Sequence, residues 1–367
     1  MRFADIRLVI GTRPEAIKLA PVAHALLECG LSPTLVFTDQ HIGLNAAEFR
    51  MEAHPAVHLG CPGEVDPHRH VQVVTDALLP LLRPAPDLLI VQGDTSSALG
   101  AALAAFMVGV PVAHVEAGLR TYDPLMPWPE EEYRTAIDAR ANLLFAPTEA
   151  AAANLRAEEV GGEIHVTGNT GIDAVLGLIP PATSLVVEKL PRILVTCHRR
   201  ESWSEGLRSI SAALTTIARE GNALIDVVLH PNQHVAATMR QSLDSIRGIS
   251  LIPPCSHSEL VRRMCDAALV LSDSGGIQEE ATAVGAPLLI LREKTERPEC
   301  IASGNALLVG TSTDRIVAEV RRLLENPFER LAMARRAFPF GDGHAGPRIA
   351  DIINSWLQQS PLTRRLA

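Results

Sequence analysis

The sequence has few cysteines, no excess of basic charge and no uninterrupted apolar helix. Its six cysteines among 367 residues form no C-x-x-C pair, so a disulfide scaffold is excluded and we expect reduced thiols in a cytosol. Lysine and arginine number 33 against 42 aspartates and glutamates, and the net charge of −9 argues against a protein that binds nucleic acid. Hydrophobic residues make up 47% of the chain, which is too large a share for a disordered protein.

One stretch could be mistaken for a membrane span. Residues 96–115 carry no charged side chain and are long enough to cross a bilayer. Pro111 would interrupt such a helix, so we expect a buried helix to about Met107, a turn and a buried strand. Charges within residues 2–7 interrupt the first apolar run too early for a signal peptide. We therefore predict a cytoplasmic protein with no membrane partner.

Several motifs of known chemistry are missing or misplaced. The chain has no Walker A motif, no G-x-S-x-G and no H-E-x-x-H. Residues 341–346 match G-x-G-x-x-G but follow no strand, so we do not expect a nicotinamide site. His54, His58, His68 and His70 lie in a loop without the spacing of a structural metal site. We predict neither a metal nor a redox cofactor.

Short apolar runs alternate with helical patterns along the chain, which indicates parallel sheets covered by helices. The series stops at residues 178–184, where prolines and small polar residues indicate a linker, and then restarts. We predict two doubly wound, Rossmann-like α/β domains at 1–182 and 183–345, and a C-terminal helix at 346–367 that packs back toward the first domain. The expected strands are residues 8–10, 88–91, 111–115, 143–145, 192–195, 225–229, 268–271 and 287–291.

Ligands of doubly wound domains bind beyond the carboxyl ends of the strands, so with two sheets we expect an active-site cleft between the domains. Residues 11–18 (GTRPEAIK) follow the first expected strand and place Arg13 and Lys18 near the start of a helix. A helix start with nearby cations is suited to an anion. The alternative is a surface turn with two solvated cations.

A second candidate for phosphate binding is residues 273–280 (DSGGIQEE), at a strand end in the second half. Ser274, Gly275 and Gly276 open a helix, where backbone N–H groups are free and no Cβ keeps a phosphate away. This placement puts Glu279 and Glu280 in the first helical turn. The alternative is a simple turn between a strand and a helix.

A third cluster, His198 with Arg199 and Arg200, also follows a strand of the second half. A histidine with paired arginines is suited to a phosphate leaving group. The alternative is a solvated arginine pair beside a structural histidine.

Carboxylates follow successive strands of the first half. Asp94, Glu116, Glu130 and Glu131 are expected along one wall of the cleft, where carboxylates facing a sugar could transfer protons at carbon. The alternative for each is an ion pair or a helix cap, and Asp94 in front of Thr95 could serve only as a cap.

Seven motifs in order, from residue 8 to about residue 350, resemble those of the non-hydrolysing UDP-N-acetylglucosamine 2-epimerases. They are residues 11–18, 93–95, 114–121, 127–131, 198–201, 273–280 and 295–299. The resemblance implies a glycosyltransferase-B-like fold and a cytoplasmic homodimer that serves cell-envelope polysaccharide synthesis. It also implies interconversion of UDP-N-acetylglucosamine and UDP-N-acetylmannosamine without a cofactor, by elimination of UDP to a 2-acetamidoglucal and its readdition.

The resemblance assigns roles by position. The acid/base carboxylates are Asp94, Glu116 and Glu130, with His198 as a further catalytic candidate. The expected substrate-binding residues are Arg13, Lys18, Arg134, His198, Arg199, Ser274, Gly275, Gly276, Glu280 and Arg297.

The sequence departs from the family in the expected uracil site and in a second, allosteric site, and also at Cys197 and His230, where the family usually has glycine and asparagine. His257 and Leu260 replace the tyrosine and phenylalanine expected around the uracil. An allosteric UDP-N-acetylglucosamine site of several members is matched at Gln40, His41 and Arg69. However, the family's two glutamines and a histidine at that site are replaced here by Gly43, His70 and Val228.

Other functions remain open from the sequence. One alternative is a hydrolysing 2-epimerase that releases N-acetylmannosamine and UDP, and another is an epimerase of a modified UDP-sugar. A retaining glycosyltransferase would share the two-domain architecture but would not need the carboxylate series. An inactive nucleotide-sugar sensor would not need intact carboxylates.

Overall fold

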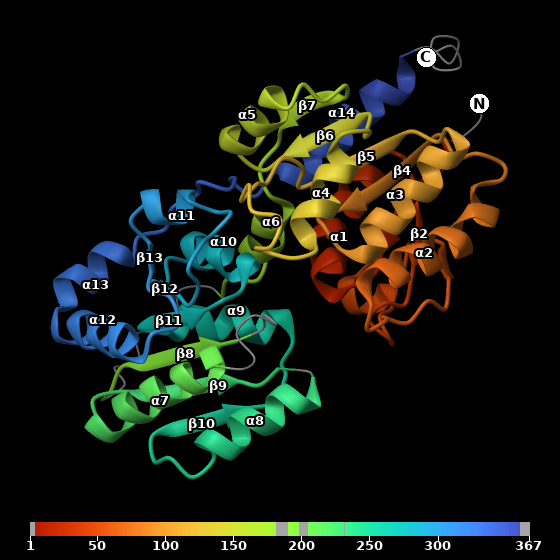
Figure 1. Ribbon diagram of the computed structural model, residues 1–367. Helices are drawn as coiled ribbons and strands as arrows, with labels where there is room; N and C mark the ends of the chain where they lie inside the picture. The colour runs from red at the N-terminus through yellow and green to blue at the C-terminus, as the bar shows by residue number, and fades with distance from the viewer. Residues whose placement is uncertain (1–3, 181–189, 198–204, 231, 360–367) are drawn as a thin grey trace. The chain divides into compact units, whose positions relative to one another are not determined.

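The computed structural model describes residues 4–180, 190–197, 205–230 and 232–359. It divides into two compact units (Figure 1). Unit 1 runs to Ala174 and resumes at Phe340, and unit 2 runs from Val175 to Pro339. Each unit is a parallel sheet with helices on its faces, which confirms the prediction of two Rossmann-like α/β domains. The linker expected at residues 178–184 lies partly outside the described residues.

The sheet of unit 1 has the strand order β3-β2-β1-β4-β5-β6-β7, and every neighbouring pair is parallel. This order reverses direction between β1 and β4, as in other doubly wound sheets. The strands are β1 (Ile6–Ile10), β2 (Thr34–Phe37), β3 (Ala56–His58), β4 (Leu88–Gln92), β5 (Val112–Val115), β6 (Leu143–Ala146) and β7 (Glu163–Val166).

Helices cover both faces of this sheet because successive strand residues point to opposite sides. Leu8 and Ile10 pack in the core cluster formed with α1 and α14, whereas Val9 packs in the cluster formed with α2 to α5. The helices of unit 1 are α1 (Arg13–Glu28), η1 (Ala46–Phe49), α2 (Pro67–Leu78), η2 (Leu79–Leu82), α3 (Ser96–Val108), α4 (Glu130–Asp138), α5 (Glu149–Ala157), α6 (Thr170–Leu176, at the unit boundary) and α14 (Ala345–Gln358).

Unit 2 repeats the architecture, with the strand order β10-β9-β8-β11-β12-β13 and parallel neighbours throughout. Its strands are β8 (Arg192–Thr196), β9 (Leu224–Val228), β10 (Ile249–Ile252), β11 (Leu269–Ser272), β12 (Leu288–Ile290) and β13 (Ala306–Leu308). Its helices are α7 (Glu205–Glu220), α8 (Gln233–Leu243), α9 (His257–Asp266), α10 (Gly275–Val284), α11 (Glu299–Ala302), α12 (Thr313–Glu325) and α13 (Pro327–Met333).

The eight strands expected from the sequence are confirmed, each within two residues at either end. The apolar stretch from residue 96 forms α3 and β5, joined by a turn at Gly109, as expected. Within the described part of the chain, no helix is long and apolar enough to span a membrane.

The C-terminal helix α14 completes the core of unit 1 by packing against α1 (Figure 1). Ile349 and Ile353 are fully buried in the same cluster as Leu19 of α1. The backbone N–H groups of Ala345 and Gly346, at the helix start, donate to the Asp173 carboxylate at 3.2 and 2.7 Å. Carboxylates at a helix N-terminus are favourable because they accept from unsatisfied N–H groups.

The packing of α14 on α1 gives a first prediction. A Cβ added at Gly346 would lie 2.7 Å from the Pro21 carbonyl oxygen of α1, so Gly346→Ala should force the helices apart. We expect this variant to lose about 1–3 kcal/mol of unfolding free energy, as overpacked sites do. Gly161→Ala is the control, because a Cβ there meets no atom within 4 Å. Urea unfolding with equal midpoints for both variants would contradict the close approach.

Candidate active site

The carboxyl edge of the unit 1 sheet gathers acidic side chains. Strands β4 and β5 are paired so that Gln92 lies opposite Val115, and the turns after the two strands therefore start side by side. Asp94 lies in the first turn and Glu116 directly follows the second strand. Helix α4 begins at Glu130, which is half-buried.

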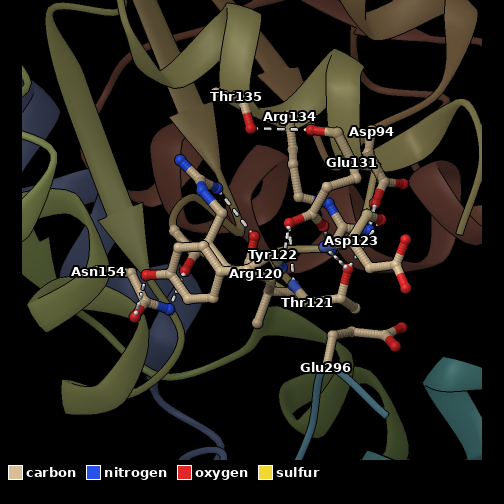
Figure 2. A network of polar contacts seen from close by, with 12 residues as sticks. Asp94, Arg120, Thr121, Tyr122, Asp123, Glu131, Arg134, Thr135, Asn154 and Glu296 are labelled. Atoms are coloured by element: carbon tan, nitrogen blue, oxygen red, sulfur yellow. Dashed lines mark hydrogen bonds and ion pairs between the residues drawn. The ribbon is translucent and has the colours of Figure 1, made fainter. Parts of the chain in front are cut away.

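Arg134 of α4 is the cation that holds Asp94 (Figure 2). Its guanidinium donates through Nη2 to Asp94 and through Nη1 to Glu131 at 3.2 Å, and only 3% of its side chain is exposed. The Glu131 carboxylate also accepts the backbone N–H groups of Thr121 and Tyr122, both at 2.9 Å. Arg134 and Glu131 thus connect the turn after β4 to the segment that leads into α4.

The structure excludes a capping role for Asp94. The N-cap of α3 is Thr95, whose hydroxyl accepts the N–H of Ala98 at 3.0 Å. Asp94 is 29% exposed and bound to Arg134, so its carboxylate is both accessible and charge-compensated.

Glu116 is held in a strained backbone conformation. Its φ of 72° lies in the left-handed region, which costs a residue other than glycine about 1–3 kcal/mol. The carboxylate accepts from the Lys18 ammonium and, at 2.6 Å, from the Gln92 side-chain amide. Both donors stabilise the ionised carboxylate. Such strain at a buried, charged residue is typical of functional sites.

Glu15 is a further acidic group at this edge, and it lies on α1 with 1% exposure. Its carboxylate accepts the N–H groups of Gly11 and Thr12, at 3.0 and 2.5 Å, and the Thr95 hydroxyl at 2.7 Å. Burial raises the pKa of Glu15 to about 7, because these neutral donors only partly offset the lost hydration. Glu15 therefore joins the turn after β1 to the cap of the helix that follows Asp94.

Two other residues predicted in unit 1 are placed as follows. Lys18 lies among the acidic side chains at the carboxyl edge of the unit 1 sheet, because it contacts Glu116. Arg13 instead binds the exposed Glu48, and its guanidinium lies 5.9 Å from the centre of the Phe49 ring. Its side chain is 44% exposed.

The residues that match the allosteric site are largely engaged within the protein. Gln40 accepts the Ser97 hydroxyl at 2.7 Å, and His41 accepts the backbone N–H of Arg13 at 3.3 Å. Burial and the Arg13 charge lower the pKa of His41. Arg69 is exposed and lies 3.7 Å from Glu64.

His70 is not at the surface of this region. It is 1% exposed, and its Nε2 lies 3.1 Å from the Cys61 carbonyl oxygen while Nδ1 lies 2.6 Å from the Ser96 hydroxyl. Both ring nitrogens therefore have partners inside unit 1.

In unit 2, helix α10 begins with the two glycines after Ser274. A Cβ on Gly275 would lie 2.6 Å from an Arg297 guanidinium nitrogen, whereas at Gly276 the nearest atom is a Glu280 oxygen at 4.0 Å. The first glycine is therefore needed for internal packing, and the second leaves the helix start open. The expectation that Glu279 and Glu280 lie in the first turn is wrong, because the glycines are themselves helical and occupy that turn.

Arg297 and Glu279 form a buried ion pair beneath this helix start. The Arg297 Nε donates to Glu279 at 2.5 Å, and its Nη1 donates to Glu296. Glu296 also binds Arg292 at 2.8 Å. The guanidinium of Arg297 therefore supports α10 from inside unit 2.

Glu280 has an unexpected partner. The His257 Nε2 lies 3.0 Å from its carboxylate, and both side chains are largely buried. Burial disfavours the charged ring, but the Glu280 charge and hydrogen bond outweigh it and raise the pKa of His257.

His198 and Arg199 lie outside the described residues, so their predicted roles stay predictions. Among the residues that are described, no cluster of acidic, histidine or cysteine side chains could hold a metal ion. The sequence interpretation did not assign roles to Gln92 and Glu15, and it grouped Glu131 with the acid/base candidates, whereas the Glu131 carboxylate binds Arg134 and two backbone N–H groups. The spacing of Glu131 and Arg134, three apart on one helix, was the signal that could have revealed their contact.

The chain is similar to known proteins over nearly its whole length. Residues 28–354 match the family described as UDP-N-acetylglucosamine 2-epimerase. A relative from Salmonella typhimurium, named UDP-N-acetylglucosamine 2-epimerase, is 40% identical over 370 residues. The match covers 95% of this chain and 98% of the relative.

Solved structures agree with this similarity. A crystal structure from Listeria monocytogenes has a TM-score of 0.91 and 33% identity, and the match covers 98% of each chain. The UDP-GlcNAc 2-epimerase of Neisseria meningitidis, crystallised with UDP-GlcNAc, has a TM-score of 0.88 and 33% identity. That match covers 96% of this chain and 100% of the other. The glycosyltransferase-B-like fold is therefore confirmed.

The raised pKa of Glu15 gives a second prediction. The native protein keeps a proton on Glu15 that the unfolded chain loses above about pH 4.5, so native stability falls as pH rises from there to about 7. Glu15→Gln cannot ionise and should escape this loss. Relative to wild type, it should gain up to about 3 kcal/mol of unfolding free energy between about pH 5 and pH 8.

The measurement is urea unfolding over that pH range. Glu52→Gln, at an exposed position, serves as the control and should follow the wild-type profile. A Glu15→Gln profile parallel to wild type would show that Glu15 does not titrate in this window.

Proposed function

Because the chain belongs to the UDP-N-acetylglucosamine 2-epimerase family, we propose that it interconverts UDP-N-acetylglucosamine and UDP-N-acetylmannosamine without hydrolysis. The carboxylates of unit 1 act on the sugar, and the glycine-rich helix start of unit 2 binds the diphosphate. The observation that carries the proposal is the set of charge-compensated carboxylates at the unit 1 sheet edge, namely Asp94 with Arg134 and Glu116 with Lys18.

The chemistry requires both parts. The C2–H of the sugar is not acidic until the bond from C1 to the UDP oxygen weakens. As that bond breaks, electron deficiency at C1 acidifies C2–H and a carboxylate takes the proton, which gives 2-acetamidoglucal and UDP. Protonation of C2 from the opposite face and attack of the UDP oxygen on C1 then give the epimer. Because the two faces need separate proton donors or acceptors, one carboxylate is not enough.

The structure supports distinct roles for the carboxylates. Glu116 is suited to accept the proton, because Lys18 and Gln92 stabilise its ionised form. Asp94 and Glu130 are candidates for the other face. Arg134, bound to Asp94, keeps that carboxylate in place.

Unit 2 supplies the complementary charge for the leaving UDP. The N-terminus of α10 offers the backbone N–H groups of Gly275 and Gly276, where negative charge is favoured, whereas the Ser274 N–H donates to the Ser272 hydroxyl at 3.0 Å. Glu280 is proposed to contact UDP, and the buried Arg297 supports the start of α10 through its ion pair with Glu279. His198 and Arg199 are proposed to stabilise the departing diphosphate.

Three further parts of the proposal follow from the family resemblance. They are a homodimer, a cytoplasmic location and a role in cell-envelope polysaccharide synthesis. The competing activities are hydrolysis to N-acetylmannosamine and UDP, and epimerisation of an already modified UDP-sugar.

Incubation with UDP-N-acetylglucosamine in D₂O, followed by NMR, tests the reaction. We expect deuterium at C2 of both epimers, with the sugar still attached to UDP at equilibrium. Free sugar would support the hydrolysing alternative, and an unexchanged C2 would contradict epimerisation through proton removal.

The third prediction concerns the carboxylates, read in the same assay. Asp94→Asn, Glu116→Gln and Glu130→Gln should each lower turnover about 100-fold or more, the usual scale for acid/base groups, with much smaller changes in substrate affinity. Glu132→Gln is the matched control, because Glu132 is an exposed neighbour on α4. Near-normal turnover in all three variants would refute the proton-transfer assignment.

The fourth prediction concerns regulation. A ligand shifts an equilibrium only by binding two states differently, and typical couplings are about 1–3 kcal/mol. Gly43 and Val228 bring no polar side-chain group to the matched region, and both ring nitrogens of His70 have partners inside the protein. The loss of two hydrogen bonds to the allosteric ligand, each worth about 1.5–3 kcal/mol, would remove the whole coupling free energy between the two sites. The reverse reaction from UDP-N-acetylmannosamine alone should therefore start without a lag.

Progress curves with and without trace UDP-N-acetylglucosamine are the measurement. The curves should coincide from the first turnover. A lag that trace UDP-N-acetylglucosamine abolishes would show that a second site works despite these substitutions.

A further inference from the structure

A chain of buried hydrogen bonds runs from the end of α4 to the backbone beside Asp94. The Asp138 carboxylate lies 2.6 Å from the His114 Nδ1, and the His114 Nε2 lies 2.8 Å from the Gly93 carbonyl oxygen. Asp138 and His114 are both fully buried. Gly93 directly precedes Asp94, so this chain ends at the peptide that carries the proposed acid/base group.

The partners fix the direction of each hydrogen bond. The Gly93 carbonyl can only accept, so the His114 Nε2 donates to it. The second carboxylate oxygen of Asp138 accepts the Gly118 N–H at 3.1 Å and the Arg120 Nη1 at 2.8 Å. Burial opposes ionisation of Asp138, but the charges of His114 and Arg120 outweigh it and lower its pKa. An ionised Asp138 accepts from the His114 Nδ1 as well.

Asp138 also connects the other two carboxylate-bearing segments. Gly118 and Arg120 belong to the turn that follows Glu116. Asp138 is the last residue of α4, whose first residue is Glu130. One buried carboxylate thus touches, directly or through His114, each segment that bears a proposed acid/base group.

We propose that His114 and Asp138 are positioning residues for the proton-transfer step. The Nε2–H of His114 fixes the Gly93–Asp94 peptide, and Asp138 fixes the ring of His114 together with the turn after Glu116. The inference rests on the proposed function, because it presumes that Asp94 and Glu116 transfer protons. Neither positioning side chain touches the substrate, so both act through geometry, where small displacements lower rates strongly.

His114 offers a matched pair of substitutions. An asparagine amide nitrogen takes about the place of Nδ1, so His114→Asn keeps the bond to Asp138 and loses the bond to Gly93. A glutamine amide nitrogen takes about the place of Nε2, so His114→Gln keeps the bond to Gly93 and leaves Asp138 with one donor fewer. Removing a partner from a buried charge costs more stability than removing one from a neutral carbonyl.

The two variants should therefore rank in opposite orders for stability and for turnover. We expect His114→Gln to unfold at lower urea concentration than His114→Asn, yet to turn over about 10–100-fold faster, because it alone retains the bond that places Asp94. The loss in His114→Asn should appear in kcat, with UDP affinity by calorimetry unchanged within about twofold. When Asp94 is already replaced by asparagine, adding His114→Asn should lower kcat little further, as expected for residues that act through the same group.

The C2 deuterium assay separates the possible failures. An inactive wild type would overturn the proposed function and this inference with it. If the wild type is active, two results would overturn the positioning role alone. One is equal turnover of His114→Asn and His114→Gln, and the other is faster turnover in whichever of the two variants is more stable. If a variant fails to fold, ¹⁵N spectra of the wild-type His114 ring decide. A solvent-protected N–H at Nε2 supports the inference, and an Nε2 that carries no proton overturns it.

Discussion

Charge compensation at the carboxyl edge of the unit 1 sheet is the constraint on which the site depends. A parallel sheet brings the ends of all its strands to one edge, so carboxylates placed after successive strands must lie near one another. Like charges at low dielectric repel strongly, and each carboxylate needs its own donors. Lys18 serves Glu116 and Arg134 serves Asp94, while Asp138 is bound to both His114 and Arg120.

The two units also differ in how their charged groups are placed. Unit 1 concentrates negative groups with fixed cations, which suits proton transfer at carbon. In unit 2 the open helix start at Gly276 offers neutral N–H donors, while the charges of Arg297 and Glu279 are satisfied in its interior. Glu15 is a contrast within unit 1, because neutral donors hold it and its pKa rises to about 7.

Much of this could be predicted from local sequence. Strands such as β4 and β8 are apolar runs with clear boundaries, and the residues after them carry the motifs. The short strands β3 and β13 have only three residues each, too few for a recognisable period. The contacts of Asp138 and Glu116 could not be predicted, because they join residues 18 to 98 positions apart. Local patterns place a side chain on an element but do not determine its distant partner.

Helix α14 makes unit 1 discontinuous in sequence, since unit 2 lies between Ala174 and Phe340. During synthesis the strands of unit 1 leave the ribosome before unit 2, but the side of α1 that packs on α14 has no cover until Ile349 and Ile353 emerge. Unit 2 is continuous and has all its residues available earlier. Domains fold as units once their chain is complete. Unit 1 therefore begins to be synthesised before unit 2 but completes its folding after it. Until α14 has been made, the proposed acid/base residues belong to an unfinished core.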